Sequence, residues 1–318
     1  MVGLSISNVI SISGKRSSLP KPTYFGIVVD TTQTGVSNND QFQFTGAVGD
    51  YDVTALQNDV EVATFSDLSD AATITLPSAG VYELRVQPKE VNGFNRIAFD
   101  NGGDKDKLTE IKSWGSDVVW SSFNDAFRGC SNLGECDIVD IPNLSNVTNM
   151  GFIFLGASNF NADLSNWDVS NVTNMSFIFL GASNFNSDLS NWDVNSVTTM
   201  SRMFRDASSF TSDLSNWDVS SVSNMGDMFV GVSSFTSDLS NWDVSNVTDM
   251  TNMFLNADIN EAGTTTNYDN LLNGWSALTL QNNVSFNGGN SQYSAAGATG
   301  RDILINTYNW TISDAGLI

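Results

Sequence analysis

DLSNWDVSNVTNMSFIFLGASNFNS, residues 163–187, is followed directly by DLSNWDVNSVTTMSRMFRDASSFTS (188–212) and DLSNWDVSSVSNMGDMFVGVSSFTS (213–237). A fourth copy starts at Asp238, so that four tryptophans lie 25 residues apart: Trp167, Trp192, Trp217 and Trp242. A fixed period of roughly 20–50 residues is typical of a solenoid, in which each unit buries one face against its neighbours. The repeat therefore predicts a solenoid of 25-residue coils over residues 141–260.

The apolar positions within one unit predict a strand followed by a short helix. Leu-x-x-Trp-x-Val (164–169) has the spacing of the strand segment of a leucine-rich repeat. Val172, Met175 and Phe179 lie at i, i+3 and i+7, on one face of a helix. Ser170 or Asn171 is a suitable helix N-cap, as is Ser220 one unit further on, and Gly156 and Gly181 are suitable helix ends. We therefore expect leucine-rich-repeat-like α/β coils whose recurring Trp, Met and Phe side chains form the core.

Two columns of polar residues are expected on the solvent face of the coils. They are Asp168, Asp193, Asp218 and Asp243, and beside them Asn166, Asn191, Asn216 and Asn241. Carboxylates stacked about 5 Å apart repel one another unless something compensates them. Either each carboxylate accepts backbone N–H groups of its own turn, or the column binds Ca²⁺ between coils. The sequence contains no calcium-loop motif, and these residues are candidates for a ligand or partner surface.

The unit of residues 188–212 differs from the one before it at two exposed positions. Arg202 and Arg205 replace Phe177 and Leu180 of the preceding unit. A basic pair on an otherwise acidic face is a candidate contact for a ligand or for a second subunit, or it is a chance surface difference.

The sequence before the repeats divides into an arm and a region of short strands. Residues 1–22 alternate apolar side chains with serine and glycine, and the apolar ones are Val2, Leu4, Ile6, Val9, Ile10 and Ile12. This arm is either an anchor that docks onto another protein or the first strand of the next domain. Residues 23–100 carry strand-like runs at 24–30, 41–46, 51–56, 60–65, 72–77, 81–88 and 95–100, separated by turn residues. Their close spacing predicts an antiparallel β-sandwich.

The repeats are expected to have a cap at each end. In the junction, residues 101–140, FRGCSNL (127–133) matches FLGASNF (154–160) at an offset of 27 residues, so the first coil is atypical. In the C-terminal cap, residues 261–318, we predict a helix around Leu271–Trp275, a helix over 295–306, and strands at 278–280, 284–286 and 310–314. The two cysteines, Cys130 and Cys136, are either a disulfide or free, small buried side chains.

The overall charge limits the partners. The formal net charge is −22, with 13 Lys and Arg against 35 Asp and Glu and no histidine. Nucleic acid and anionic membranes need clustered basic residues, so neither is an expected partner. No run of about 20 apolar residues exists to span a bilayer. We expect no zinc site, because the chain lacks histidine and a second cysteine pair.

The unit LSNWDVSNVTNMS, repeated almost verbatim, resembles the BspA-like leucine-rich repeats known from mycoplasma surface lipoproteins. The segment that begins FDNGGDKDKLTEIKSWG and ends at Trp120 (99–120) is similar to the linker that joins a PKD-type or immunoglobulin-like sandwich to such repeats. The resemblance implies a surface-exposed recognition protein, an adhesin above all, without enzymatic activity or cofactor. The chain departs from the cellular members because it shows no secretion signal, lipobox cysteine or sorting domain.

Two functional hypotheses follow from this combination. The first is a bacteriophage virion protein, a fibre or decoration component. Residues 1–22 would anchor it to other virion proteins, and its solenoid would contact a glycan or protein of the host surface. The second is a bacterial cell-surface adhesin, and a homo-oligomer fits either. An enzyme such as a glycan hydrolase is disfavoured, since repetition alone explains the many carboxylate pairs.

Overall fold

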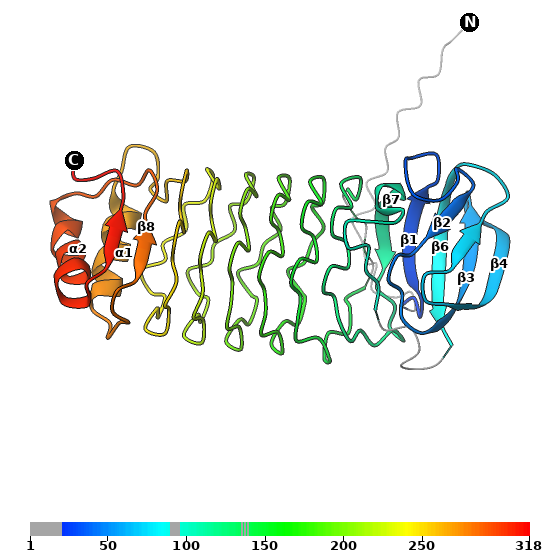
Figure 1. Ribbon diagram of the computed structural model, residues 1–318, viewed down its shortest axis with the longest axis horizontal. Coiled ribbons are helices and arrows are strands. Elements are labelled where there is room, and N and C mark those ends of the chain that lie inside the picture. The colour runs from blue at the N-terminus through cyan, green and yellow to red at the C-terminus, as the bar shows by residue number, and fades with distance from the viewer. Residues whose placement is uncertain (1–20, 90–95, 135, 137, 139) are drawn as a thin grey trace, which may run out of the picture.

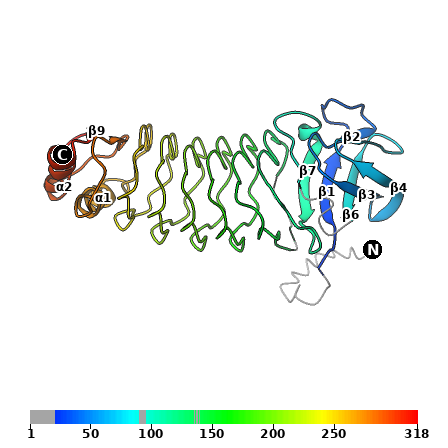
Figure 2. The ribbon, with the colours of Figure 1, turned by 60° about the horizontal axis from the view of Figure 1, so that its bottom comes forward.

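The structure, a computed structural model, describes residues 21–89, 96–134, 136, 138 and 140–318. The molecule is elongated: a β-sheet forms one end, a row of stacked coils forms the middle, and two helices form the other end (Figure 1). Figure 2 shows the same three parts along the long axis from a second direction. The predicted anchor, Val2 to Ile12, lies outside the described residues.

The sheet at the N-terminal end has five antiparallel strands in the order β4-β3-β6-β1-β7. They are β1 (Phe25–Asp30), β3 (Asp50–Gln57), β4 (Val60–Ser69), β6 (Val81–Pro88) and β7 (Leu108–Ser113). A separate antiparallel pair consists of β2 (Gln41–Gln43) and β5 (Thr73–Thr75). The predicted immunoglobulin-like or PKD-like sandwich is therefore wrong, because one five-stranded sheet faces only a two-stranded ribbon instead of a second full sheet.

Local sequence explains most of these strands. In β1 the side chains of Phe25, Ile27 and Val29 are fully buried, as their alternation predicts. Asn58 and Asp59 join β3 to β4, and both have positive φ, which asparagine and aspartate tolerate well in tight hairpins. The run at 95–100 was predicted as a strand, but in its described part only Arg96 forms isolated bridges. Strand β7 was not predicted, since it lies in the segment expected to be a junction.

The junction connects the sheet to the coils through one continuous core. Trp114 directly follows β7 and packs against Phe25 of β1, with ring centroids 6.0 Å apart. The same indole contacts Trp167 of the repeats at 5.2 Å. Gly134 donates its backbone N–H to the carbonyl oxygen of Thr109 in β7. Sheet and repeats are thus packed together without a spacer.

The repeats form a stack of coils that contain neither helices nor extended strands. In the described residues between β7 and residue 266, no such element occurs beyond isolated parallel bridges, which run Asn149–Asn174–Thr199–Asn224–Asp249. Alternate N–H groups bond to the next coil: Met175, Phe177, Phe179 and Gly181 donate to the carbonyl oxygens of Thr199, Ser201, Met203 and Arg205 at 2.8–3.1 Å. The predicted leucine-rich-repeat-like α/β solenoid is therefore wrong. Its expected helix at 172–180 is absent because these N–H groups serve the neighbouring coil instead of their own segment.

The interior of the stack consists of aromatic columns. Six phenylalanines follow one another with centroids 5.3–5.9 Å apart and nearly parallel planes: Phe127, Phe154, Phe179, Phe204, Phe229 and Phe254. A second column contains Phe160, Phe185, Phe210 and Phe235 at 6.0–6.1 Å. The repeat tryptophans are also buried, as predicted. The stacking of Phe127 on Phe154 confirms the 27-residue offset of the first coil.

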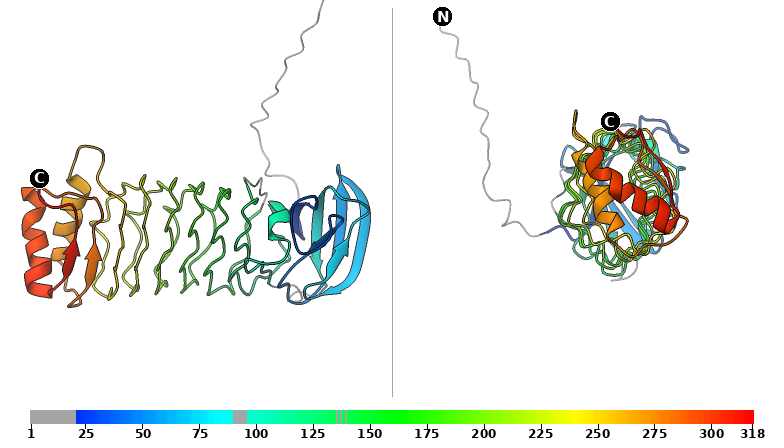
Figure 3. Two further views of the ribbon diagram at one scale, coloured as in Figure 1. Left: turned by 45° about the horizontal axis from the view of Figure 1, so that its top comes forward. Right: turned by 90° about the vertical axis from the view of Figure 1, so that its left-hand side faces the viewer.

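The C-terminal end is closed by α1 (Thr266–Ser276), α2 (Ala295–Tyr308), and the parallel pair β8 (Ser285–Asn287) and β9 (Thr311–Ser313). Figure 3 shows both helices lying across the end of the stack. Both predicted helices are confirmed, as are the strands near 284–286 and 310–314, whereas 278–280 is not a strand. Neither helix, nor any other in the described part of the chain, has the length and hydropathy needed to cross a membrane.

Candidate functional site

The two polar columns predicted from the repeats lie on the surface. All eight side chains, Asp168, Asp193, Asp218 and Asp243 with Asn166, Asn191, Asn216 and Asn241, are exposed. In each aspartate, Oδ1 accepts the backbone N–H of the residue two positions later, at 3.0–3.2 Å. Such turns are a common local role of aspartate.

These hydrogen bonds agree with the first of the two alternatives for the aspartate column, in which each carboxylate accepts the backbone N–H of its own turn. Hydrogen bonds from the Ser170 hydroxyl and then its N–H lower the pKa of Asp168, and Ser220 does the same for the pKa of Asp218. The turns of Asp168 and Asp218 thus favour the ionised form of these two carboxylates. Among the residues that the structure describes, no three acidic or cysteine side chains come together in a way that could hold a metal ion.

Arg202 occupies a special backbone position that recurs in every coil. Its φ is +56°, in the left-handed region that non-glycine residues rarely adopt. The equivalent residues also have φ between 55° and 64°: Asp125, Phe152, Phe177, Asp227 and Asn252. A residue held in this region costs of order 1–3 kcal/mol, and such strain is concentrated at functional sites.

The side chains at this position and three residues further on form what we call the lateral patch. The first set is Asp125, Phe152, Phe177, Arg202, Asp227 and Asn252, and the second is Arg128, Leu155, Leu180, Arg205, Val230 and Leu255. In contrast, the position between them is phenylalanine in all six coils and forms the buried column described above. The patch therefore varies from coil to coil while the adjacent core does not.

Side chains of the two sets stack end to end along the patch. The rings of Phe152 and Phe177 are 4.5 Å apart and nearly parallel. The Arg128 guanidinium lies 5.5 Å from the Phe152 ring centroid, and that of Arg202 lies 5.2 Å from the Phe177 centroid. Both distances fall within the range of a cation–π contact. Each ring thus has one face on the other ring and one face on an arginine.

Ion pairs flank this aromatic pair at both ends. Arg202 donates from Nε to Asp227 at 3.0 Å, and Arg205 approaches the same carboxylate at 3.6 Å. At the other end, Arg128 bonds to Asp100 at 3.0 Å and to Asp125 at 3.1 Å. The basic pair singled out from the sequence is therefore one flank of a larger patch.

The centre of the lateral patch is apolar and partly exposed. Phe152, Leu155, Phe177 and Leu180 are each half-buried, and none belongs to the core cluster of the described residues. In the sequence, Phe177 and Leu180 stand out only as the residues that Arg202 and Arg205 replace. The exposure of the first position can still be inferred from the sequence, because a position that holds Phe, Arg, Asp and Asn in successive units cannot be a core position.

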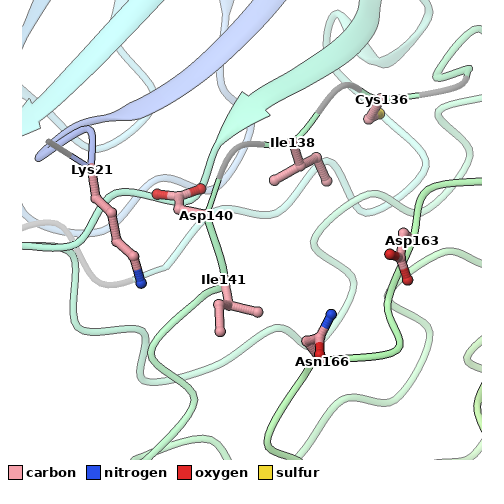
Figure 4. A pocket seen from close by; sticks show the side chains of 7 residues that line it. All are labelled: Lys21, Cys136, Ile138, Asp140, Ile141, Asp163 and Asn166. Carbon is pink, nitrogen blue, oxygen red and sulfur yellow. The ribbon is translucent and has the colours of Figure 1, made fainter. Parts of the chain in front are cut away.

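A pocket of about 250 Å³ lies beside the junction, away from this stacking arrangement. Figure 4 shows its lining: Lys21, Cys136, Ile138, Asp140, Ile141, Asp163 and Asn166. Both oxygens of Asp140 accept backbone N–H groups, from Trp114 at 2.7 Å and from Gly115 at 2.8 Å. Burial raises the pKa of Asp140 against the opposing effect of these bonds. The carboxylate serves to hold the loop after β7.

The two cysteines are not bonded to each other. Both are free thiols, with Cys130 buried and Cys136 half-buried. Burial raises the pKa of Cys136 to about 12 and that of Cys130 well above its usual value. Of the two alternatives, the buried-thiol interpretation is thus the correct one for Cys130.

The repeat region matches a known protein family. A family model described as "Mycoplasma protein of unknown function, DUF285" matches residues 121–231 and again residues 197–285, which together cover more than half of the chain. The chain belongs to the DUF285 family. This family is part of the BspA-like surface proteins of mycoplasma, so that the resemblance noted from the repeat unit is confirmed at that level.

The DUF285 matches cover the coils that carry the lateral patch and begin after β7, the last strand of the five-stranded sheet. No curated protein and no solved structure matches the chain.

Proposed function

We propose that this protein is a non-enzymatic recognition protein of the BspA-like surface type, which binds its partner through the side of the coil stack. One observation carries the proposal. The centre of the lateral patch is apolar and partly exposed, the patch varies between coils whose core is constant, and one of its two positions has a left-handed backbone in every coil. A position maintained only for packing would repeat its side chain as the core positions do.

The chemistry of the repeats supports binding more than catalysis. A general acid needs a raised pKa, whereas hydrogen bonds lower the pKa of Asp168, Asp188, Asp213 and Asp218. Repeated carboxylates that stay ionised make a solvated acidic surface. An elongated shape with a patch on its side suits presentation to a second surface.

The family favours a cell surface as the setting. Its description names mycoplasma proteins, and BspA-like proteins of mycoplasma are surface proteins. The bacteriophage alternative depends on the anchoring role of residues 1–22, most of which lie outside the described residues. That anchor, and assembly with virion proteins or with further copies, stay predictions.

Binding to intact cells tests the proposal. Purified full-length chain, labelled with a fluorophore, is titrated onto a panel of cultured bacterial and animal cells. Unlabelled chain serves as the competitor. We expect saturable, competable binding to at least one cell type. Only weak, non-saturable association across the whole panel would contradict a recognition function.

A further inference from the structure

We propose that the lateral patch binds a protein, not a glycan, and that the partner segment presents apolar side chains flanked by lysine or arginine. The inference rests on the proposed recognition function and names the class of its partner. Three features of the patch lead to it: the covered ring faces, the composition, and the surrounding charge.

The ring faces of the aromatic pair are already occupied. Phe152 lies between Arg128 and Phe177, and Phe177 lies between Phe152 and Arg202. A sugar ring binds to an aromatic side chain by lying on an open face of it, and no such face is left on either ring. Ring edges and aliphatic carbons are what a partner can reach. They fit apolar side chains of a protein.

The composition matches the energetic centre of a protein interface. Aromatic residues and arginine are enriched in such centres, and paired charges at the rim exclude water around them. Here two phenylalanines and two leucines form the centre, while Arg128 with Asp125 and Arg202 with Asp227 form the two ends. The cation–π and ion-pair contacts also hold the side chains in place before binding, which lowers the entropic cost of association.

The surrounding charge selects the sign of the partner. The three repeat-region arginines, Arg128, Arg202 and Arg205, are matched by the carboxylates of Asp100, Asp125, Asp206 and Asp227. The patch is thus close to neutral, and it lies on a chain with a net charge of −22. An acidic partner would be repelled, whereas a partner with basic residues around its apolar contact would be attracted over a distance of about one Debye length.

The chain itself offers a variant that removes the aromatic pair without disturbing the fold. Asn252 occupies the same left-handed position two coils beyond Arg202. The double variant Phe152→Asn, Phe177→Asn therefore places at both sites a residue that this backbone already accepts, and asparagine adopts positive φ at lower cost than phenylalanine. Ile303→Asn, a change of an exposed apolar side chain on α2 outside the patch, is the matched control.

Selection from a displayed library of random peptides tests the inference with the full-length chain as the target. We expect enrichment of peptides that combine apolar residues with lysine or arginine. A synthetic copy of such a peptide should bind the double variant at least about tenfold more weakly than the wild type and the Ile303→Asn control. Its affinity should fall as salt is added. The melting temperature of each variant shows that its fold is retained.

The outcomes separate this inference from the proposed function. Failure to enrich any peptide that distinguishes the wild type from the double variant overturns the inference, as does binding to a glycan array that the double variant loses. Cell binding that the double variant keeps would leave the recognition function standing and remove it from this patch. Peptide binding at the patch without any cell binding would support the inference about the patch and contradict the proposed recognition function.

Discussion

Each tryptophan at the repeat position from Trp192 onward links its coil to the preceding one by a buried hydrogen bond. Trp217 Nε1 donates to the carbonyl oxygen of Leu189 at 2.9 Å, and Trp242 repeats the bond to Leu214. We expect Trp217→Phe to lower the free energy of unfolding by about 1–3 kcal/mol, because the bond and part of the buried volume are lost. Urea unfolding followed by far-UV circular dichroism measures this. The exposed neighbour change Asn216→Ala should have almost no effect, and equal losses in the two variants would contradict the role assigned to the indole.

Lys107 is a fully buried cation directly before β7. Its Nζ donates to the carbonyl oxygens of Ser37, Asn38 and Gln41 at 2.9–3.1 Å, and the buried carboxylate of Asp104 lies 3.5 Å away. The ammonium group therefore takes the place that a bound metal ion has in an oxygen-lined loop. Lys107→Met leaves Asp104 without this cation, so we expect a loss of about 3–5 kcal/mol.

Lys112 provides the control for this prediction. It lies in β7, and its side chain is 39% exposed beside Glu110. Lys112→Met should change the free energy of unfolding by less than about 1 kcal/mol. Thermal and urea unfolding of both variants decide the matter. A Lys107→Met protein as stable as the Lys112→Met protein would show that the buried ammonium group contributes nothing.

At the scale of the single turn, the aspartates make the coils sensitive to acid. Hydrogen bonds lower the pKa of Asp168, Asp188, Asp213 and Asp218 below the value expected in the unfolded chain. Their contribution is therefore complete above the unfolded pKa of about 4, and it is lost as the pH falls through the lower folded values. We expect the melting temperature to fall steeply below about pH 4.

An asparagine at the same turn position accepts the same bond without titrating. Asn174 Oδ1 already does so from the N–H of Ser176 at 2.9 Å. The double variant Asp168→Asn, Asp218→Asn should be as stable as the wild type at pH 7. Between pH 5 and pH 3 it should lose less stability than the wild type, because two fewer turns titrate. Differential scanning calorimetry across this range measures the difference. Parallel pH profiles would rule out these turns as the source of acid sensitivity.

The elements that the sequence predicted well are those with long, regular patterns. The alternation in β1 and the helical face of α1 were sufficient, because each pattern continues over several residues of one conformation. The helix predicted from Val172, Met175 and Phe179 is wrong for a physical reason. Phe177 has a φ of +64°, which ends any right-handed helix, and successive tight turns also bring residues three apart to the same side. Apolar spacing alone cannot separate the two conformations.

The candidate site was predictable only in part. The solvent-facing columns of Asn166 and Asp168 follow from the burial of Trp167 between them. The lateral patch needs the backbone, because the left-handed φ turns Phe152 and Phe177 outward although both are as apolar as the buried Phe154 and Phe179. Arg202 and Arg205, which the sequence singled out, lie in this patch, and the structure adds their aromatic neighbours to it.

At the scale of the whole molecule, the coils, the sheet and the helical cap share one core. Trp114 and Phe25 join the sheet to the first coils, and Phe286 of β8 contacts Phe254 of the last coil at 6.3 Å. Each coil contacts only its neighbours, so stability is expected to be close to a sum of coil and interface contributions. Coil register, more than coil number, should therefore decide whether the chain folds.

Removing whole or partial coils tests this expectation. Deletion of residues 188–212 takes out one full unit and brings residues 213–237 into the same register against 163–187, with Phe229 taking the place of Phe204 on Phe179. Deletion of residues 188–199 removes about half a unit. The acceptor of the Met175 N–H, Thr199, is lost, and the other acceptors of this row and the aromatic columns are shifted out of register. We expect the full-unit deletion to unfold in one cooperative transition with the near-UV tryptophan signal retained, because each remaining interface is intact. The half-unit deletion should lose that signal and expose apolar surface, seen as binding of a hydrophobic dye. Equal folding of both deletions would mean that the 25-residue register does not determine the fold.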